Sequence, residues 1–399
     1  MSNNISIRVM PEVKGDFWSF ASVFMIVSNC GSILHVFMAR VVWLVIFAIF
    51  IVQVLRRRVH VSANLVVALI VIWLISFTSA LVTCTSVSCY NGVFVGSLLA
   101  LLVIGSCGNN CQVISDNIYR SCRIVSYLGI LNVILYLFFP SFFVYLINES
   151  GFGINTILFV FNYQNDEIIR NQGLYWEPGV FQVLLNIYLF IMLVERRYPY
   201  KKAILPIFLI ISTFSTTGLI IMSLILFCSF VKRKKTITPI KKIFLVSFFA
   251  ILLSPIVYNN VIEKFSSDKS PSSALRTYDF FMGLNIIKDN PLWGVGMDPQ
   301  QFSKRARGID IIGYDTSVLN INRGNTNAII SIAMMLGVPV LLLFVITMYR
   351  QKLFLKRKLF FCVIFVSLFS EPLFPFPLLF LLCLSSIINP SNLKSYSIN

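Results

Sequence analysis

An arginine and a glutamate in one polar stretch of the sequence could together act on a phosphate or a sugar hydroxyl. The stretch runs from 165 to 179 and contains Arg170 and, further along, Glu177 followed by Pro178. A guanidinium binds phosphate oxygens bidentately, and a carboxylate can accept or orient a hydroxyl proton. A simpler interpretation is that Glu177 caps a helix starting at Pro178 and pairs with Arg170. The sequence leaves both interpretations open.

Two further arginines lie in a second polar stretch, from 259 to 325. Arg276 and Arg323 could each hold a phosphate. Their alternative role is an ion pair within the stretch, with Asp279 or Asp315 as partner. Both arginines are therefore candidates for anion binding.

Glycine and aromatic residues accompany these charged groups. Gly294 and Gly296 on either side of Val295 predict a tight turn or a close approach of two backbones. The side chains of Tyr175, Trp176 and Trp293 could stack on sugar rings, or they could anchor the chain at a membrane interface.

The sequence also argues against several kinds of chemistry. It has no Walker A motif and no H-E-x-x-H, so ATP-driven transport and a metalloprotease site are not encoded. The two histidines, His35 and His60, lie outside the polar stretches, which disfavours a Ser-His-Asp hydrolase and a His-based metal site. We expect no metal and no cofactor.

The composition defines the elements that must position these residues. Hydrophobic residues make up 57% of the 399-residue chain and charged residues 12%, with a mean hydropathy of +0.83. A soluble enzyme, a disordered chain and a nucleic-acid-binding domain are excluded, because soluble domains carry about 25% charged residues. The sequence predicts an all-α, polytopic integral membrane protein, with roughly twelve helices of about 20 residues.

Apolar runs and their interruptions give the expected positions of the membrane helices. The predicted spans lie near 17–36, 41–55, 64–82, 93–107, 124–147, 179–195, 203–213, 217–231, 243–258, 326–348, 359–370 and 373–388. We expect one transmembrane domain over 1–399, with two large loops at about 148–178 and 259–325. No soluble domain and no repeat is evident.

Basic runs predict the orientation of the spans. The formal net charge is +17, and basic residues collect in cytoplasmic loops. The basic runs at 56–58, 196–202, 232–235 and 356–358 all close apolar spans. Placing them inside puts both termini in the cytoplasm and both large loops outside. Because the basic excess is an orientation signal, we expect no nucleic-acid partner.

The order of several short motifs resembles the O-antigen polymerase (Wzy) family within the O-antigen ligase/polymerase superfamily. The similarity covers roughly 125–390. In chain order, the motifs that carry it are Arg170, Gly173, Glu177 and Pro178; the Ser/Thr-rich joint from Ser212 to Gly218; Arg276 with Pro291, Leu292, Gly294 and Gly296; Asn325 and Asn327; and Ser370, Glu371 and Pro372.

Two departures from the family pattern bear on function. Related ligases carry a histidine near the end of the large loop, whereas 321–327 contains none, which favours polymerase over ligase. The helix-pair joint often carries Ser-Arg-Thr in the family and reads Ser215-Thr216-Thr217 here, so a phosphate role for that position is in doubt.

The resemblance implies a GT-C-like glycosyltransferase at the periplasmic face of the bacterial inner membrane. It would polymerise oligosaccharide repeat units carried on undecaprenyl pyrophosphate into O-antigen or a related surface polysaccharide. Arg170 and Arg276 would bind the pyrophosphate or sugar, and Glu177 would act as base or orient the acceptor hydroxyl. Further implied substrate-binding residues are Arg323, Tyr175, Trp176, Trp293 and Asn327.

The sequence is also compatible with other functions. An O-antigen ligase would attach finished polymer to lipid A–core, and a polysaccharide flippase would move lipid-linked units. Large outer loops and nearly uncharged span interiors disfavour a flippase, and no feature suggests a scaffold or sensor. Besides lipid-linked oligosaccharides and membrane lipids, the resemblance implies a polysaccharide chain-length regulator as a partner.

Overall fold

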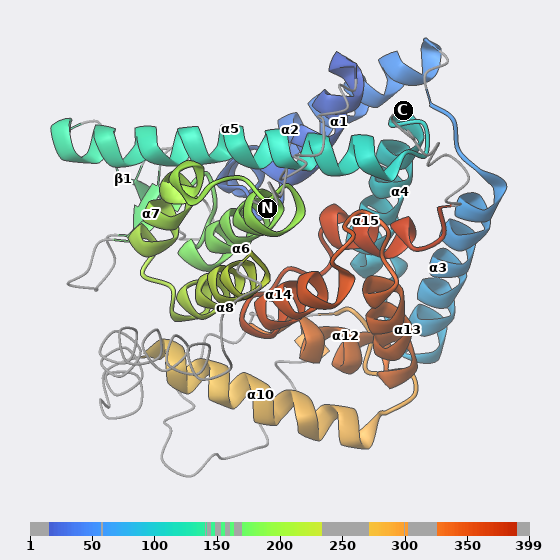
Figure 1. The fold of residues 1–399 in the computed structure, drawn as a ribbon. Coiled ribbons are helices and arrows are strands. Elements are labelled where there is room, and N and C mark those ends of the chain that lie inside the picture. The colour runs from blue at the N-terminus through green and yellow to red at the C-terminus, as the bar shows by residue number, and fades with distance from the viewer. Residues whose placement is uncertain are drawn as a thin grey trace. The chain divides into compact units, whose positions relative to one another are not determined.

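The computed structural model of the chain consists almost entirely of helices (Figure 1). It describes residues 16–56, 59–139, 141, 145–147, 153–155, 160–162, 170–233, 271–298, 300–301 and 325–388. The chain forms two compact units. The first unit comprises Met1–Ile49, Gln112–Pro255 and Phe354–Val363, and the second comprises Phe50–Cys111, Ile256–Leu353 and Ile364–Asn399.

Four helical segments of the described chain are long and apolar enough to cross a membrane. They are α3 (Ala63–Val82), the continuous segment Val87–Ser106 that includes α4 (Asn91–Ser106), α5 (Cys111–Phe138), and Pro178–Glu195, in which a π-helical turn extends α6 (Pro178–Phe190). Shorter apolar helical segments accompany them at Phe17–Ser28, Val41–Leu55, Thr216–Val231 and Val338–Tyr349. These helices confirm the expectation of a helical, multi-pass membrane protein. The expected number of spans stays a prediction.

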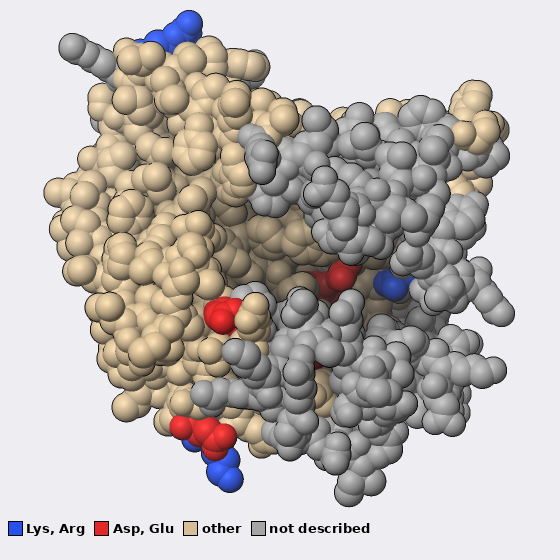
Figure 2. Space-filling view, turned by 180° about the vertical axis from the view of Figure 1, so that it is seen from behind, with Lys and Arg blue, Asp and Glu red and all other residues tan. Residues whose placement is uncertain are grey.

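These helices expose apolar side chains, as expected for helices that face lipid. On α3, Val67 is 58% exposed and Leu74 is 58% exposed, and no water-soluble protein leaves such a stripe open without reason. Figure 2 shows a face on which uncharged residues cover nearly all of the described surface.

In the first unit, α6 forms the centre. Every residue of α6 is buried, and the helix packs against α7 (Ile204–Ser212) and α8 (Thr216–Arg233). The unit also contains α1 (Phe17–Ser28), the start of α2 (Ile33–Leu55) and most of α5. The two amide side chains of α6 are buried with it, and Asn186 Nδ2 donates to Gln182 Oε1 at 2.9 Å. Polar side chains avoid lipid, which favours a central place for α6.

The second unit is built around the packing of α4 on α15 (Pro377–Ser385). Gly92 and Gly96 allow this contact, because a Cβ at either position would meet Pro375. The unit also contains α3, α10 (Pro271–Asp289), α12 (Ala328–Leu336), α13 (Val338–Tyr349) and the end of α14 (Arg357–Ser370).

Three helix boundaries differ from the predicted spans. The run 17–36 contains a break, because α1 ends at Ser28 and Gly31 adopts a positive φ of 77° before α2 begins. Helix α5 begins at Cys111 and ends at Phe138, although a span at 124–147 was expected. The run 326–348 is divided at Gly337, with φ 90°, into α12 and α13. The predicted span at 243–258 lies outside the described residues.

Short strands depart from the expected all-α fold. Strand β1 (Tyr145–Ile147) pairs with β2 (Gly153–Asn155), and β3 (Val160–Asn162) pairs with β4 (Arg170–Gly173), both antiparallel. Apolar periodicity over three or four residues is too short to reveal such strands. The structure describes part of the loop that was predicted at 259–325. Most of the described part is helix α10 and the turn that follows it.

Candidate functional site

In the first unit, the guanidinium of Arg170 reaches the joint between α7 and α8. Its Nε donates to the carbonyl oxygen of Thr213 at 3.1 Å, and its Nη2 donates to that of Phe214 at 3.4 Å. Phe214 has a positive φ of 46°, so the helix pair is broken here by irregular backbone. Irregular backbone within a membrane protein needs polar partners, and Arg170 supplies them for two carbonyls.

The buried side chain of Asn171 fixes strand β4 next to this joint. Its Oδ1 accepts from Asn132 Nδ2 at 2.9 Å and from the Gly173 backbone N–H at 3.0 Å. Its Nδ2 donates to Ser212 Oγ at 3.1 Å and to the Gly129 carbonyl at 3.3 Å. Asn171 therefore ties β4 to both α5 and α7, and it positions the neighbouring Arg170. No sequence motif indicates this role.

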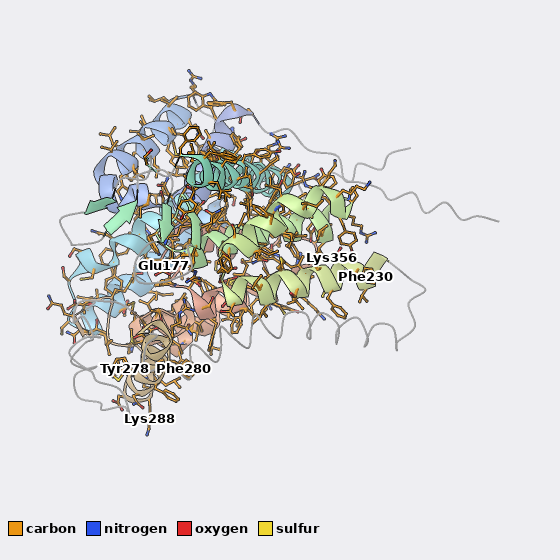
Figure 3. The ribbon with its side chains drawn as sticks, turned by 90° about the vertical axis from the view of Figure 1, so that its left-hand side faces the viewer. Glu177, Phe230, Tyr278, Phe280, Lys288 and Lys356 are labelled. Carbon is orange, nitrogen blue, oxygen red and sulfur yellow. The ribbon has the colours of Figure 1, made fainter. Side chains whose placement is uncertain are left out.

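Glu177 lies at the start of α6, as the sequence predicts, but its carboxylate does not cap the helix. It is the N-cap residue by backbone geometry, with φ −140° and ψ 145°, and it makes no side-chain cap hydrogen bond. Within the described chain it also forms no ion pair with Arg170. Figure 3 shows Glu177 beside the strands where α6 begins. The carboxylate is half-buried and available to a ligand.

The two aromatic residues that precede Glu177 differ in their burial. Tyr175 is 0% exposed, its ring stacks on Phe181 with centroids 5.8 Å apart, and its hydroxyl donates to the Val27 carbonyl at 3.4 Å. With no open face on which a sugar could stack, Tyr175 is a packing residue in this structure. Trp176 is half-buried, and its backbone N–H donates to the Gly31 carbonyl at 3.1 Å.

In the second unit, Arg276 on α10 lies beside Glu371. Its Nη2 is 3.8 Å from Glu371 Oε1. The side chain of Arg276 is 45% exposed, whereas that of Glu371 is 1% exposed. The buried carboxylate therefore orients an arginine that solvent can reach. The sequence motif includes Glu371 but does not predict this pairing. The signal for its role is a lone acidic residue between the apolar segments of α14 and α15.

Asp279, a predicted ion-pair partner of Arg276, forms hydrogen bonds with other residues. Its side chain is fully buried, and its Oδ2 accepts from the Thr326 backbone N–H at 3.1 Å. Its carbonyl oxygen accepts from Asn325 Nδ2 at 2.7 Å. These bonds tie α10 to the start of α12.

Asn327, a predicted substrate-binding residue, is the N-cap of α12. Its Oδ1 accepts from the backbone N–H groups of Ile329 at 3.0 Å and Ile330 at 3.1 Å. Because helix capping by Asn already accounts for this side-chain oxygen, the structure gives Asn327 a structural role.

The glycine pair makes the close backbone approach that the sequence predicts. Gly294 and Gly296 have positive φ values of 65° and 82°. The Val295 N–H donates to the Met334 carbonyl at 2.9 Å, and the Gly296 N–H donates to that of Met335 at 3.0 Å. A Cβ at Gly294 would overlap the Met334 carbonyl.

Trp293 lines a cavity next to this turn. The cavity has a volume of about 380 Å³, and Trp293 is 40% exposed. Its walls are Val82, Thr83, Asn290, Pro291, Leu292, Trp293, Gly294, Val295 and Gln301. An exposed indole with hydroxyl and amide groups nearby has the chemistry to receive a sugar ring.

Two predicted groups fall outside the described residues, namely Arg323 and Asp315. In the part of the chain that the structure describes, no three His, Cys, Asp or Glu side chains gather so as to hold a metal ion.

The fold and these sites define a multi-pass membrane protein with arginine and carboxylate groups at irregular joints. A protein-family model described as O-antigen ligase matches residues 203–345. This range includes the α7–α8 joint, Arg276, Trp293 and Asn327, and it begins after Arg170 and Glu177. The match supports the O-antigen ligase/polymerase superfamily and a role in surface polysaccharide synthesis, and it does not distinguish polymerase from ligase. The comparison with curated proteins finds no match.

Proposed function

We propose that this protein is an O-antigen-type polymerase, a glycosyltransferase of the bacterial inner membrane. It acts on oligosaccharide repeat units carried on undecaprenyl pyrophosphate at the periplasmic face. The bond between the growing chain and its lipid pyrophosphate breaks, and a new glycosidic bond forms to a non-reducing-end hydroxyl of the incoming unit. The hydroxyl proton goes to a base, and undecaprenyl pyrophosphate leaves.

The observation that carries this proposal is the placement of Arg170 at the α7–α8 joint. The leaving group develops negative charge on its pyrophosphate, and a preorganised guanidinium stabilises such charge. Two carbonyl groups, of Thr213 and Phe214, hold the Arg170 side chain in place. The family pattern places an arginine within the joint sequence, and here Arg170 brings a guanidinium to the joint from β4.

Glu177 is the proposed base or acceptor-orienting group. A carboxylate in hydrogen-bond reach of the acceptor hydroxyl would remove its proton as the glycosidic bond forms. The absence of a side-chain cap bond at Glu177 supports this role over that of a helix cap.

Arg276 is a second proposed anion-binding residue, oriented by the buried carboxylate of Glu371. Trp293, at the 380 Å³ cavity in the same unit, would stack on a sugar ring. Trp176 and Arg323 remain proposed substrate contacts. The proposed reaction uses only side chains of this protein and needs no cofactor.

The O-antigen ligase is the alternative, and the family match supports it equally well. The absence of histidine from 321–327 favours the polymerase. A flippase is disfavoured because three of the four described candidate spans carry no charge away from their ends, whereas transporters usually carry charged residues inside their spans. The exception is α5, which contains Asp116, Arg120 and Arg123.

The test is the lipopolysaccharide of a strain that lacks this protein. A lost polymerase leaves core carrying one repeat unit, whereas a lost ligase or flippase leaves core alone. Restoring the strain with the Arg276→Ala variant should also give core plus one repeat. The matched control is Lys288→Ala, an exposed cation on the same helix (Figure 3), which should restore long chains. Core alone in the deletion strain would refute the polymerase assignment.

A further inference from the structure

A patch of exposed cations lies at the far end of α6 from Glu177. It contains Arg197, Lys201, Lys202, Lys356, Arg357 and Lys358, all of them exposed and all in the first unit. Figure 3 shows Glu177 and Lys356 toward opposite ends of the green helices to which α6 belongs. The helical segment Pro178–Glu195 spans 18 residues, or about 27 Å at 1.5 Å per residue. The patch is thus separated from Glu177 by about the thickness of a bilayer core.

Two segments far apart in the sequence converge in this patch. Glu195 Oε1 accepts from the Lys356 backbone N–H at 2.8 Å, and its Oε2 accepts from the Leu355 backbone N–H at 3.2 Å. This contact brings the cations after Glu195 next to those that begin α14. Six cations from two separate segments of the chain therefore form one surface. A positive-inside bias places cations on one side of the membrane, but it does not require them to gather.

The nearby acidic groups are already engaged. The carboxylate of Asp116 pairs with buried Arg196, and that of Glu195 holds the two backbone N–H groups. These bonds leave the exposed cations with a net positive field, which attracts an external anion.

The cations of α14 lie at its N-terminus, where positive charge destabilises a helix. Lys356 precedes the helix, and Arg357 and Lys358 occupy its first turn. Positive charge at a helix N-terminus opposes the helix dipole, and three neighbouring cations also repel one another. Glu195 accepts from the backbone N–H groups of Leu355 and Lys356, which precede the first turn of the helix. A bound anion would offset both costs.

Exposed apolar side chains indicate where that anion resides. Leu355 is 64% exposed and Ile204 is 64% exposed, and Tyr200 is 36% exposed. Each lies beside cations of the patch in the sequence. Cations interleaved with aliphatic and aromatic side chains are typical of a surface at the lipid headgroups.

The geometry points to a binding site for an anionic phospholipid on this patch. The lipid phosphate contacts the six cations, while its acyl chains lie against Leu355 and Ile204. This site is separate from the proposed glycosyltransferase residues, and its test does not depend on that function.

The experiment uses the full-length protein in detergent, mixed with phosphatidylglycerol or with phosphatidylcholine. The test variant carries Lys356→Gln, Arg357→Gln and Lys358→Gln. The control variant removes three exposed cations elsewhere, with Arg56→Gln, Lys288→Gln and Arg350→Gln. Lipid retained in native mass spectrometry and the rise in Tm on adding lipid are measured for each.

We expect phosphatidylglycerol to bind the wild-type protein in preference to phosphatidylcholine. The test variant should bind it roughly a hundredfold more weakly, because each of the three cations near a lipid surface contributes about a factor of five. The control variant should lose less than about threefold, because dispersed charges are screened. Without lipid, the test variant should melt at or above the wild-type temperature.

Four results would overturn the site. The first is equal phosphatidylglycerol binding by the test variant and the wild type. The second is an equal loss in the control variant. The third is stabilisation by inorganic phosphate as strong as that by phosphatidylglycerol, which would show a simple phosphate site. A lipid-free test variant that melts well below wild type would show that the cations are structural, and would also contradict the proposal.

Discussion

At the scale of single residues, the proposed chemistry depends on how arginine and glutamate side chains are held. Arg170 is held by two carbonyl oxygens, and Arg276 pairs with one buried carboxylate at 3.8 Å. A guanidinium can bind protein on one edge and phosphate on another, because its five N–H donors form a rigid planar fork. Lysine has no such second edge, and this difference can be tested.

For Arg170, we predict that Arg170→Lys loses nearly all polymerisation although it keeps the charge. A lysine ammonium cannot hold both the Thr213 and Phe214 carbonyls and a pyrophosphate. The measurement is the ladder of lipopolysaccharide chain lengths in the complemented deletion strain. Arg197→Lys, at an exposed position away from the joint, serves as the control and should give a normal ladder. A normal ladder from Arg170→Lys would show that charge alone suffices there.

For Glu177, we predict that Glu177→Gln lowers the polymerisation rate by about a hundredfold or more, as expected for the loss of a general base. The Tm should stay unchanged, because the carboxylate makes no cap bond. Rate and Tm are measured on the same purified protein. A fall in Tm with the rate preserved would assign Glu177 to helix stability.

At the scale of elements, hydrogen bonds between β4, α5 and α7 position Arg170. We predict that Asn171→Ala destabilises the protein by about 2 to 3 kcal/mol, because it leaves buried polar partners unsatisfied. It should also reduce polymerisation, since β4 loses its connection to Ser212 and Asn132. Thermal unfolding and the lipopolysaccharide ladder measure the two effects. The exposed Asn91 provides the control, and Asn91→Ala should change neither.

Most helices could be predicted from the sequence, because apolar runs of membrane length reflect local composition. The start of α6 at Pro178 and the turn at Gly294 and Gly296 are found where local patterns placed them. The breaks at Gly31 and Gly337 were missed, since a single glycine interrupts no apolar run. The strand pairs were missed because three-residue strands have no usable periodicity.

The site could be predicted only in part, because its contacts join residues far apart in the sequence. Arg170 and Thr213, or Arg276 and Glu371, meet only after folding, and no local pattern indicates these pairs. Tyr175 is predicted to contact a sugar but is buried in the structure. The residue type alone does not show whether an aromatic side chain is buried. Glu371 was not expected as a partner of Arg276, because a motif does not show which way its carboxylate points.

For the molecule as a whole, the proposed function requires an orientation in the membrane that puts Glu177 outside and the cation patch inside. Cys84 is an exposed free thiol after α3, on the side predicted to be periplasmic. Cys111 is half-buried and lies on the side predicted to be cytoplasmic. We predict that a membrane-impermeant maleimide labels Cys84 in intact spheroplasts, and that Cys84→Ser together with Cys89→Ser removes the labelling on this side. Cys111 should react only after lysis, and the reverse pattern would invert the topology.

The central claim is that this chain joins lipid-linked repeat units to one another, and reconstitution tests it most directly. The purified protein would be placed in liposomes with lipid-linked repeat units isolated from the deletion strain, with and without lipid A–core. We predict products of two or more repeats and release of undecaprenyl pyrophosphate whether or not lipid A–core is present, and no such products from Arg170→Lys. Transfer to lipid A–core without any joining of repeat units would contradict the account and identify a ligase.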